Sequence, residues 1–171
     1  NDKYWKGDLV RACACRGPHS GFVHIRCLVA LAEVKGENGD DHAFFDALLT
    51  CGQCRQDFDG AVNVALKCAM WLHVADRAET DGLRQVALFN LGVALCNVKR
   101  LDESLICYKE VLATRRRLYG PDDDRTIAAD VAVAVTLRKQ GGAENLQSSL
   151  HTLTRVHAWR IQRYGRDHER T

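Results

Sequence analysis

The second half of the chain repeats itself, and this constrains the fold more than any other feature of the sequence. The segment 90–94 matches the segment 130–134 at a separation of 40 residues. Two later matches lie 45 residues apart, namely Ser104-Leu105 with Ser149-Leu150 and the motif G-x-D-x-x-R-T at 120–126 with the same motif at 165–171. Periods of 20–50 residues are typical of solenoids, in which each unit buries its apolar face against a neighbour.

Apolar residues in this half recur at intervals of three and four, as they do on one face of a helix. The pattern predicts helices over 61–77, 83–98, 102–118, a stretch through 127–137, and 145–164. We expect Asp102 to cap the third helix and the run 122–124 to cap the fourth, because Asp side chains accept from free helical N–H groups. Small residues are expected where paired helices approach closely: Gly92, Ala94, Ala132 and Ala134.

The difference between the two separations indicates a five-residue insertion, which we place in the turn at Gly141-Gly142.

The run Asn90-Leu91-Gly92, Tyr108 and the run 118–122 resemble the kinesin-light-chain type of tetratricopeptide repeat. This resemblance covers 83–171 and implies two repeats that offer a surface to a peptide or substrate protein. Residues 61–80 are then expected to form a connecting or capping helix.

Residues 1–60 have a different character, since they are rich in Gly and Asp and carry a net charge of −2 from 7 basic and 9 acidic residues. One short helix is expected within 22–34, with Leu28, Leu31 and Ala32 on one face, and 36–42 is expected to be an exposed loop. Such a segment buries little apolar area, and domains below about 70–80 residues usually need a staple.

Cysteines supply a candidate staple, because five of the 8 cysteines lie before residue 55. Cys13 and Cys15 form a C-x-C pair, Cys51 and Cys54 form a C-x-x-C pair, and His24-x-x-Cys27 lies between the pairs. Pairs at this spacing place two soft ligands on one zinc ion, and a second pair completes the tetrahedron. Free structural thiols are the alternative interpretation.

The order of these residues, together with Cys15-Arg16-Gly17 and Phe22-Val23-His24, resembles the RING-CH family of zinc domains. The resemblance implies a zinc site made by the third, fourth, seventh and eighth ligands of the family, which are Cys13, Cys15, Cys51 and Cys54. His24 and Cys27 match half of a second site, whose other pair would lie upstream in a longer protein. His19 and His42 are alternative ligands for that pair.

Two functions remain open at this stage. A RING-type ubiquitin ligase would bind a conjugating enzyme, and the resemblance implies that Leu28 and Arg55 contact that partner. A non-catalytic adaptor would use zinc only to hold the N-terminal domain, and the repeats to bind a protein partner. We expect a mainly α protein, with a zinc-stapled RING-like domain over 1–60 followed by an α-solenoid.

Charge and hydropathy narrow the class of partner. The formal net charge is only +2, which gives no strong attraction to nucleic acid. No run of 18 uncharged apolar residues exists, so no transmembrane helix is expected. Nothing in the sequence signals secretion, so we expect an intracellular, cytoplasmic location. The chain has no initiator Met, and we interpret it as a fragment.

Overall fold

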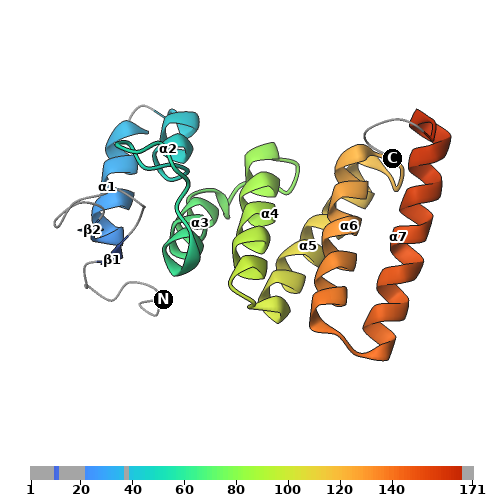
Figure 1. The fold of residues 1–171 in the computed structure, drawn as a ribbon. Coiled ribbons are helices and arrows are strands. Elements are labelled where there is room, and N and C mark those ends of the chain that lie inside the picture. Colours follow the sequence, from blue (N-terminus) through green and yellow to red (C-terminus); the bar gives the residue numbers. More distant parts are fainter. Residues whose placement is uncertain (1–9, 12–21, 37–38, 167–171) are drawn as a thin grey trace. The chain divides into compact units, whose positions relative to one another are not determined.

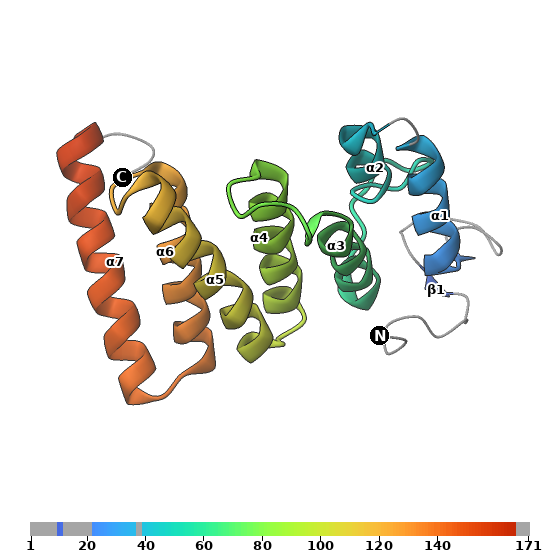
Figure 2. The same cartoon turned by 180° about the vertical axis from the view of Figure 1, so that it is seen from behind.

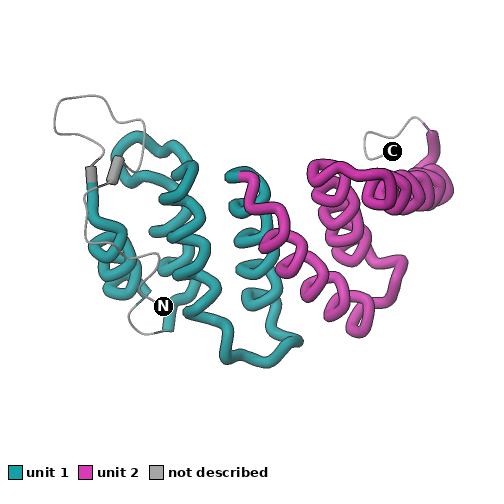
Figure 3. Tube along the Cα trace, turned by 90° about the horizontal axis from the view of Figure 1, so that it is seen from below, with its two compact units in different colours: residues 1–98 teal, residues 99–171 magenta. Residues whose placement is uncertain are grey.

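The computed structural model describes residues 10–11, 22–36 and 39–166, and these residues are mainly helical (Figure 1). The chain divides into two compact units, residues 1–98 and residues 99–171 (Figure 3). The first unit contains the strands β1 (Val10–Arg11) and β2 (Phe22–Val23) and the helices α1 (Ile25–Lys35), α2 (Asp41–Ala47), α3 (Gly60–Val74) and α4 (Gly82–Asn97). The second contains α5 (Leu101–Tyr119), α6 (Asp124–Gln140) and α7 (Ala143–Tyr164).

The first unit begins with a short antiparallel pairing of β1 and β2, in which Val10 lies opposite Val23. Helix α1 then packs against α2 and α3, and α3 packs against α4. Gly36, the C-cap of α1, allows the close approach of α2, because a Cβ atom there would lie 2.9 Å from the Cβ of Phe44. A larger residue at this position would push the two helices apart.

One apolar core joins the loop-rich N-terminal segment to α3. Phe44 and Leu48 from the α2 region are 2% and 0% exposed, and Phe58 is 4% exposed. They form one cluster with apolar side chains of α1, α3 and α4: Ala32, Val62, Leu66, Ala69, Met70, Val74 and Ala87. Burial of such side chains contributes about 1.5–3 kcal/mol each. The expectation that 1–60 buries little apolar area is therefore wrong for its described part.

Two further expectations for this segment need correction. Helix α2 starts at Asp41, within the stretch that we expected to be a loop, and Asp40 caps it by accepting from the N–H of Ala43 at 3.0 Å. Helix α1 buries Ala32 fully but leaves Leu31 49% exposed, so Leu31 is not on the buried face. The boundary between the compact units falls after residue 98. The predicted boundary near residue 60, between a zinc-binding and a helical domain, stays a prediction.

The second unit is a run of three helices in which α5 packs on α6 and α6 packs on α7. Figures 1 and 2 show α6 and α7 side by side, joined by a short turn. Asp123 caps α6 by accepting from the N–H of Arg125 at 2.9 Å, as the run of acidic residues predicted. The N-cap of α5 is Arg100 and not Asp102, which instead lies in the first turn.

The five-residue insertion does not enlarge the turn at Gly141-Gly142. The turn between α6 and α7 contains only these two glycines, and both have positive φ. The extra residues lengthen the two helices instead, since α6 and α7 have 17 and 22 residues where α4 and α5 have 16 and 19. Helix α7 begins at Ala143 rather than at the expected residue 145. Of the small residues, Gly92, Ala94 and Ala134 are buried, whereas Ala132 is only half-buried.

Candidate functional site

The C-x-x-C pair of the sequence lies in a closed turn between α2 and α3. The N–H of Cys51 donates to the carbonyl of Gln56 at 2.8 Å, and the N–H of Arg55 donates to the carbonyl of Cys51 at 2.9 Å. Thr50 and Asp57 form an antiparallel bridge just outside these bonds. Arg55 adopts a left-handed conformation with φ of 59°, which is uncommon for a residue with a side chain. The turn therefore has a defined backbone.

The two cysteines of this turn, Cys51 and Cys54, are both half-buried. Cys51 also packs against the apolar core of the first unit. The predicted partners of this pair, Cys13 and Cys15, lie outside the described residues, as does His19. The four-thiolate site thus stays a prediction.

His24 and Cys27 lie together at the start of α1. His24 is the N-cap residue and Cys27 is in the first turn, and both are exposed. The Nδ1 of His24 lies 3.9 Å from the Sγ of Cys27. Tetrahedral zinc with Zn–N and Zn–S bonds of about 2.0 and 2.3 Å would hold these atoms about 3.6 Å apart. The pair therefore fits two corners of a zinc site.

No cluster of three or more His, Cys, Asp or Glu side chains that could hold a metal occurs in the part of the chain that the structure describes. His42, the alternative ligand, is exposed on α2. Within the described ranges, no helix is both long enough and apolar enough to cross a membrane.

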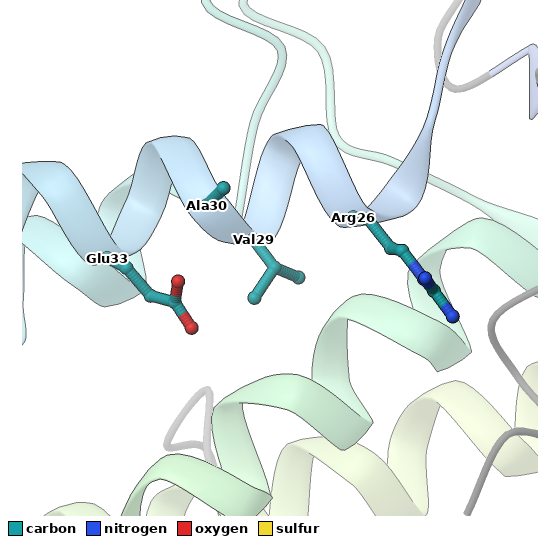
Figure 4. A pocket seen from close by; sticks show the side chains of 4 residues that line it. All are labelled: Arg26, Val29, Ala30 and Glu33. Carbon is teal, nitrogen blue, oxygen red and sulfur yellow. The ribbon is translucent and has the colours of Figure 1, made fainter. Parts of the chain in front are cut away.

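The predicted partner contacts lie in two different environments. Leu28 is partly buried and packs against the core of the first unit, whereas Arg55 is exposed at the C-x-x-C turn. A shallow pocket of about 310 Å³ lies along α1 and is lined by Arg26, Val29, Ala30 and Glu33. Figure 4 shows Arg26, Val29 and Glu33 projecting from the same side of the helix.

A charged cluster joins α2 to the last turn of α3 and to Arg77, which follows α3, and the sequence did not predict it. Arg77 donates from Nη1 and Nη2 to the two carboxylate oxygens of Asp41 at 2.7 and 2.6 Å, and His73 Nε2 lies 3.1 Å from the same carboxylate. The hydrogen bonds from Arg77 lower the pKa of Asp41 from 3.8 to about 2, with a smaller contribution from His73. The ring of His73 stacks on Phe44 with centroids 3.9 Å apart. Asp40 and Asp41 are residues that favour the start of a helix, and this is the signal in the sequence that could have located the cluster.

Lys67 is a second group that the sequence did not single out. This α3 residue is 8% exposed, and its Nζ donates to the sulfur of Met70 at 3.6 Å. Burial lowers the pKa of the ammonium, and the nearby Asp57 partly offsets this effect. Asp57 forms the bridge that flanks the C-x-x-C turn, so the charge of Lys67 interacts with a carboxylate at that turn.

The second unit is held by a buried carboxylate that links all three of its helices. Asp130 of α6 is 6% exposed. It accepts hydrogen bonds from Arg116 of α5 at 3.1 Å and from Arg155 of α7. The neighbouring Arg115 is 7% exposed and donates from Nη1 to the carbonyl of Arg125 at 2.9 Å. Arg115 and Arg116 of the basic run 115–117 therefore contribute to helix packing. The run also places positive charge at the C-terminal end of α5, where the helix dipole favours it.

One known family matches part of the helical region. Residues 83–145 match the tetratricopeptide repeat family. The match spans α4, α5 and α6 and reaches the start of α7. No curated protein matches the chain, and no solved structure does. The repeat part of the sequence analysis is thereby supported, and tetratricopeptide repeats support a role in protein–protein interaction.

Proposed function

We propose that this protein binds a protein partner through its tetratricopeptide region, with repeats of the kinesin-light-chain type over 83–171. The observation that carries the proposal is the family match over 83–145. Repeat arrays of helical hairpins present extended surfaces to their partners. We further propose a cytoplasmic location, because the free thiols of Cys27 and Cys54 fit a reducing compartment.

One face of α4 has the chemistry that such a surface needs. Val86 and Val93 are 44% and 37% exposed, although valine is normally buried. Asn90 lies between them on the same face, half-exposed, and Asn97 follows one turn later, exposed. Amide side chains offer both donors and acceptors to an extended peptide backbone, and the valines offer contact to its apolar side chains. We therefore assign partner binding to this face.

Selection from a displayed peptide library on the immobilised full chain tests the proposal. A selected peptide should lose at least about tenfold in affinity for Val93→Glu, since a charge would be buried at the contact. Ile106→Glu is the control, because Ile106 is 66% exposed on a different helix. Equal binding by both variants would refute the α4 face. Failure to select any peptide would count against the function itself.

A second proposal is that the N-terminal region binds structural zinc through Cys13, Cys15, Cys51 and Cys54. The 3.9 Å approach of His24 and Cys27 supports a further half-site, and the closed turn at 51–56 supports a fixed thiol pair. Four thiolates complete the coordination of zinc, so the metal would join distant segments and would leave no open position for catalysis.

Zinc content of the purified full chain tests this second proposal. We expect one bound zinc ion per chain, lost in the double variant Cys51→Ser, Cys54→Ser. Cys68→Ser serves as the control, because Cys68 lies in α3 outside the candidate set. Zinc content that is unchanged by the double variant would refute the assignment.

We propose that the zinc-binding, partner-binding protein is also a ubiquitin ligase. The alternative is a non-catalytic adaptor, in which zinc is purely structural. The ligase version rests on the RING-CH resemblance and on the exposed position of Arg55 beside Cys54. A ubiquitin-transfer assay with a panel of conjugating enzymes, run on the full-length protein, distinguishes the two. The ligase version predicts transfer that Arg55→Ala weakens. No transfer, together with intact peptide binding, would leave the adaptor.

A further inference from the structure

Three charged side chains meet in the second unit, where α6 lies between α5 and α7 (Figure 1). The side chain of Asp130 is 8% exposed, and its carboxylate accepts from Nη2 of Arg116 and from Nη2 of Arg155. Both nitrogens bind the same oxygen, Oδ2, so they lie within about 6 Å of each other, the length of two hydrogen bonds. We call these three residues the paired-arginine site.

Both arginines of this site have donors that Asp130 does not use. Their side chains are 51% and 40% exposed. Each guanidinium binds Asp130 through Nη2, and neither Nε nor Nη1 donates to any residue in the part of the chain that the structure describes. Because one carboxylate holds both rigid guanidinium forks in place, a further anion would bind them at a reduced entropic cost.

The packing of the repeat does not by itself require this cluster. The internal repeat matches Asp130 with Asn90, which lies 40 residues earlier, and Arg155 with Glu110, which lies 45 residues earlier. An amide and a carboxylate therefore occupy the positions at which the second copy has a carboxylate and an arginine. The paired-arginine site is thus specific to the second copy in this chain.

The charge of α7 favours an anionic ligand. Residues 145–166 contain no Asp or Glu, and they include four arginines: Arg155, Arg160, Arg163 and Arg166. Within the paired-arginine site itself, two guanidinium groups share one carboxylate, which leaves an excess of positive charge. A one-sided charge distribution of this kind attracts anions to the surface.

We propose that the paired-arginine site binds the phosphoryl group of a phosphorylated side chain in a protein partner. A carboxylate has two oxygens, and one guanidinium fork is enough to bind both of them. A phosphoryl group has three acceptor oxygens and a charge of about −1.5 to −2, so it can accept from both arginines at once. The proposal takes from the proposed function only that the partner is a protein, and it concerns helices other than α4.

Three labelled peptide pools test the proposal on the full 171-residue chain. The pools share degenerate flanking positions and differ only in the central residue, which is phosphoserine, serine or glutamate. Fluorescence anisotropy should show that the phosphoserine pool binds at least about tenfold more tightly than the other two, because only its phosphoryl group bonds to both guanidinium groups.

Three results of this experiment would overturn the proposal. The first is equal binding of the phosphoserine pool and either other pool, or no binding of the phosphoserine pool. The second is displacement of the phosphoserine pool by equimolar inorganic phosphate, which would make the ligand a free anion. The third is a single-stranded oligonucleotide that displaces the pool and binds more tightly, which would make the ligand a nucleic acid.

Substitutions decide whether the paired-arginine site is responsible. Arg116→Gln and Arg155→Gln should each weaken binding of the phosphoserine pool by at least about tenfold. Arg163→Gln is the matched control, because it removes the same charge from an exposed position on α7, and it should weaken binding by less than about threefold. Equal losses in Arg155→Gln and Arg163→Gln would overturn the proposal.

A conservative variant separates binding from folding. In Arg155→Lys the charge is kept and can still pair with Asp130, but the planar fork is lost. The thermal unfolding midpoint should therefore stay close to that of the wild type, while binding of the phosphoserine pool weakens by at least about threefold. Unchanged binding in this variant would overturn the assignment of the fork to the phosphoryl group.

Competition distinguishes this site from the proposed partner-binding face of α4. An unmodified peptide selected on that face should stay bound when the phosphoserine pool is saturating. Displacement of that peptide would place both ligands on one site and would overturn the present proposal. Failure to select any unmodified peptide would count against the α4 face alone, provided that the phosphoserine pool binds and Arg155→Gln weakens its binding.

Discussion

The two units of this protein are stabilised by different kinds of core. The first is filled by large side chains from elements of different types, with Phe44, Phe58, Leu66 and Met70 all at most 4% exposed. The second buries small and polar side chains among its aliphatic ones: Ser104, Thr114, Thr126, Thr136, Asp130 and Ser149. Regular helices of a repeat pack closely when the side chains between them are small, whereas short helices and turns leave space that aromatic side chains fill.

This comparison teaches where each unit is vulnerable. The free energy of unfolding of the first unit should decrease most when a large buried side chain is shortened. The free energy of unfolding of the second unit should decrease most when a buried ion pair or hydrogen bond is removed, or when a small side chain between helices is enlarged. The following predictions test this difference, from the largest expected effect to the smallest.

Phe44→Ala should destabilise the first unit by about 3–5 kcal/mol, because it leaves a cavity beside α3 and removes the ring that stacks on His73. Urea unfolding of the full chain measures the effect. Leu72→Ala is the control, since Leu72 is 53% exposed and should change the free energy of unfolding by less than about 0.5 kcal/mol. Similar effects of the two substitutions would contradict the assignment of the core.

Asp130→Ala should destabilise the second unit by about 2–3 kcal/mol, because it removes the carboxylate that joins Arg116 and Arg155. The two arginines are 51% and 40% exposed at the side chain, so water partly solvates them in the variant. Thermal unfolding by circular dichroism provides the measurement, with the exposed Asp122→Ala as the matched control. A decrease in thermal stability as small as that of Asp122→Ala would mean that the ion pairs of Asp130 contribute little to the stability of the second unit.

Ala134→Leu should cost about 1–2 kcal/mol by overpacking, since Ala134 is 1% exposed between helices. Ala132→Leu should cost clearly less, because Ala132 is only half-buried and the added side chain can turn toward solvent. The difference between the two unfolding midpoints in urea is the informative quantity. A larger cost at position 132 would show that the packing faces of α6 are assigned incorrectly.

Acid should weaken the link between α2 and α3. The pKa of Asp41 is lowered from 3.8 to about 2 by its bonds to Arg77 and His73, so its contribution to stability is present above pH 3.8. That contribution is lost as the pH falls through about 2, and for this partly exposed group it amounts to about 1 kcal/mol. Urea midpoints measured between pH 5 and pH 2 should show the loss in the wild-type chain. Asp41→Asn should abolish this part of the pH dependence, whereas the exposed Asp46→Asn on the same helix should retain it.

The sequence was informative to different degrees in the two units. Helices over 83–164 were predicted to within a few residues, since Gly120, the run 122–124 and Gly141-Gly142 mark helix ends by chemistry that acts locally. Helix α2 was not predicted, because seven residues give too short a pattern for periodicity to separate a helix from a loop. The candidate zinc residues were selected by their spacing and by the resemblance to the RING-CH family, and the structure adds only the proximity of His24 to Cys27.

By itself, the sequence determined the mainly helical fold, the repeat and the boundaries of its long helices. These features depend on turns, caps and apolar spacing, which are encoded within a few neighbouring residues. Tertiary structure alone decided that Phe44 and Phe58 share a core with α3, that Asp41 pairs with Arg77, and that Leu150 is exposed where Leu105 is buried. Each of these outcomes depends on which segments meet in space, and residues far apart in the chain leave no local pattern of their meeting.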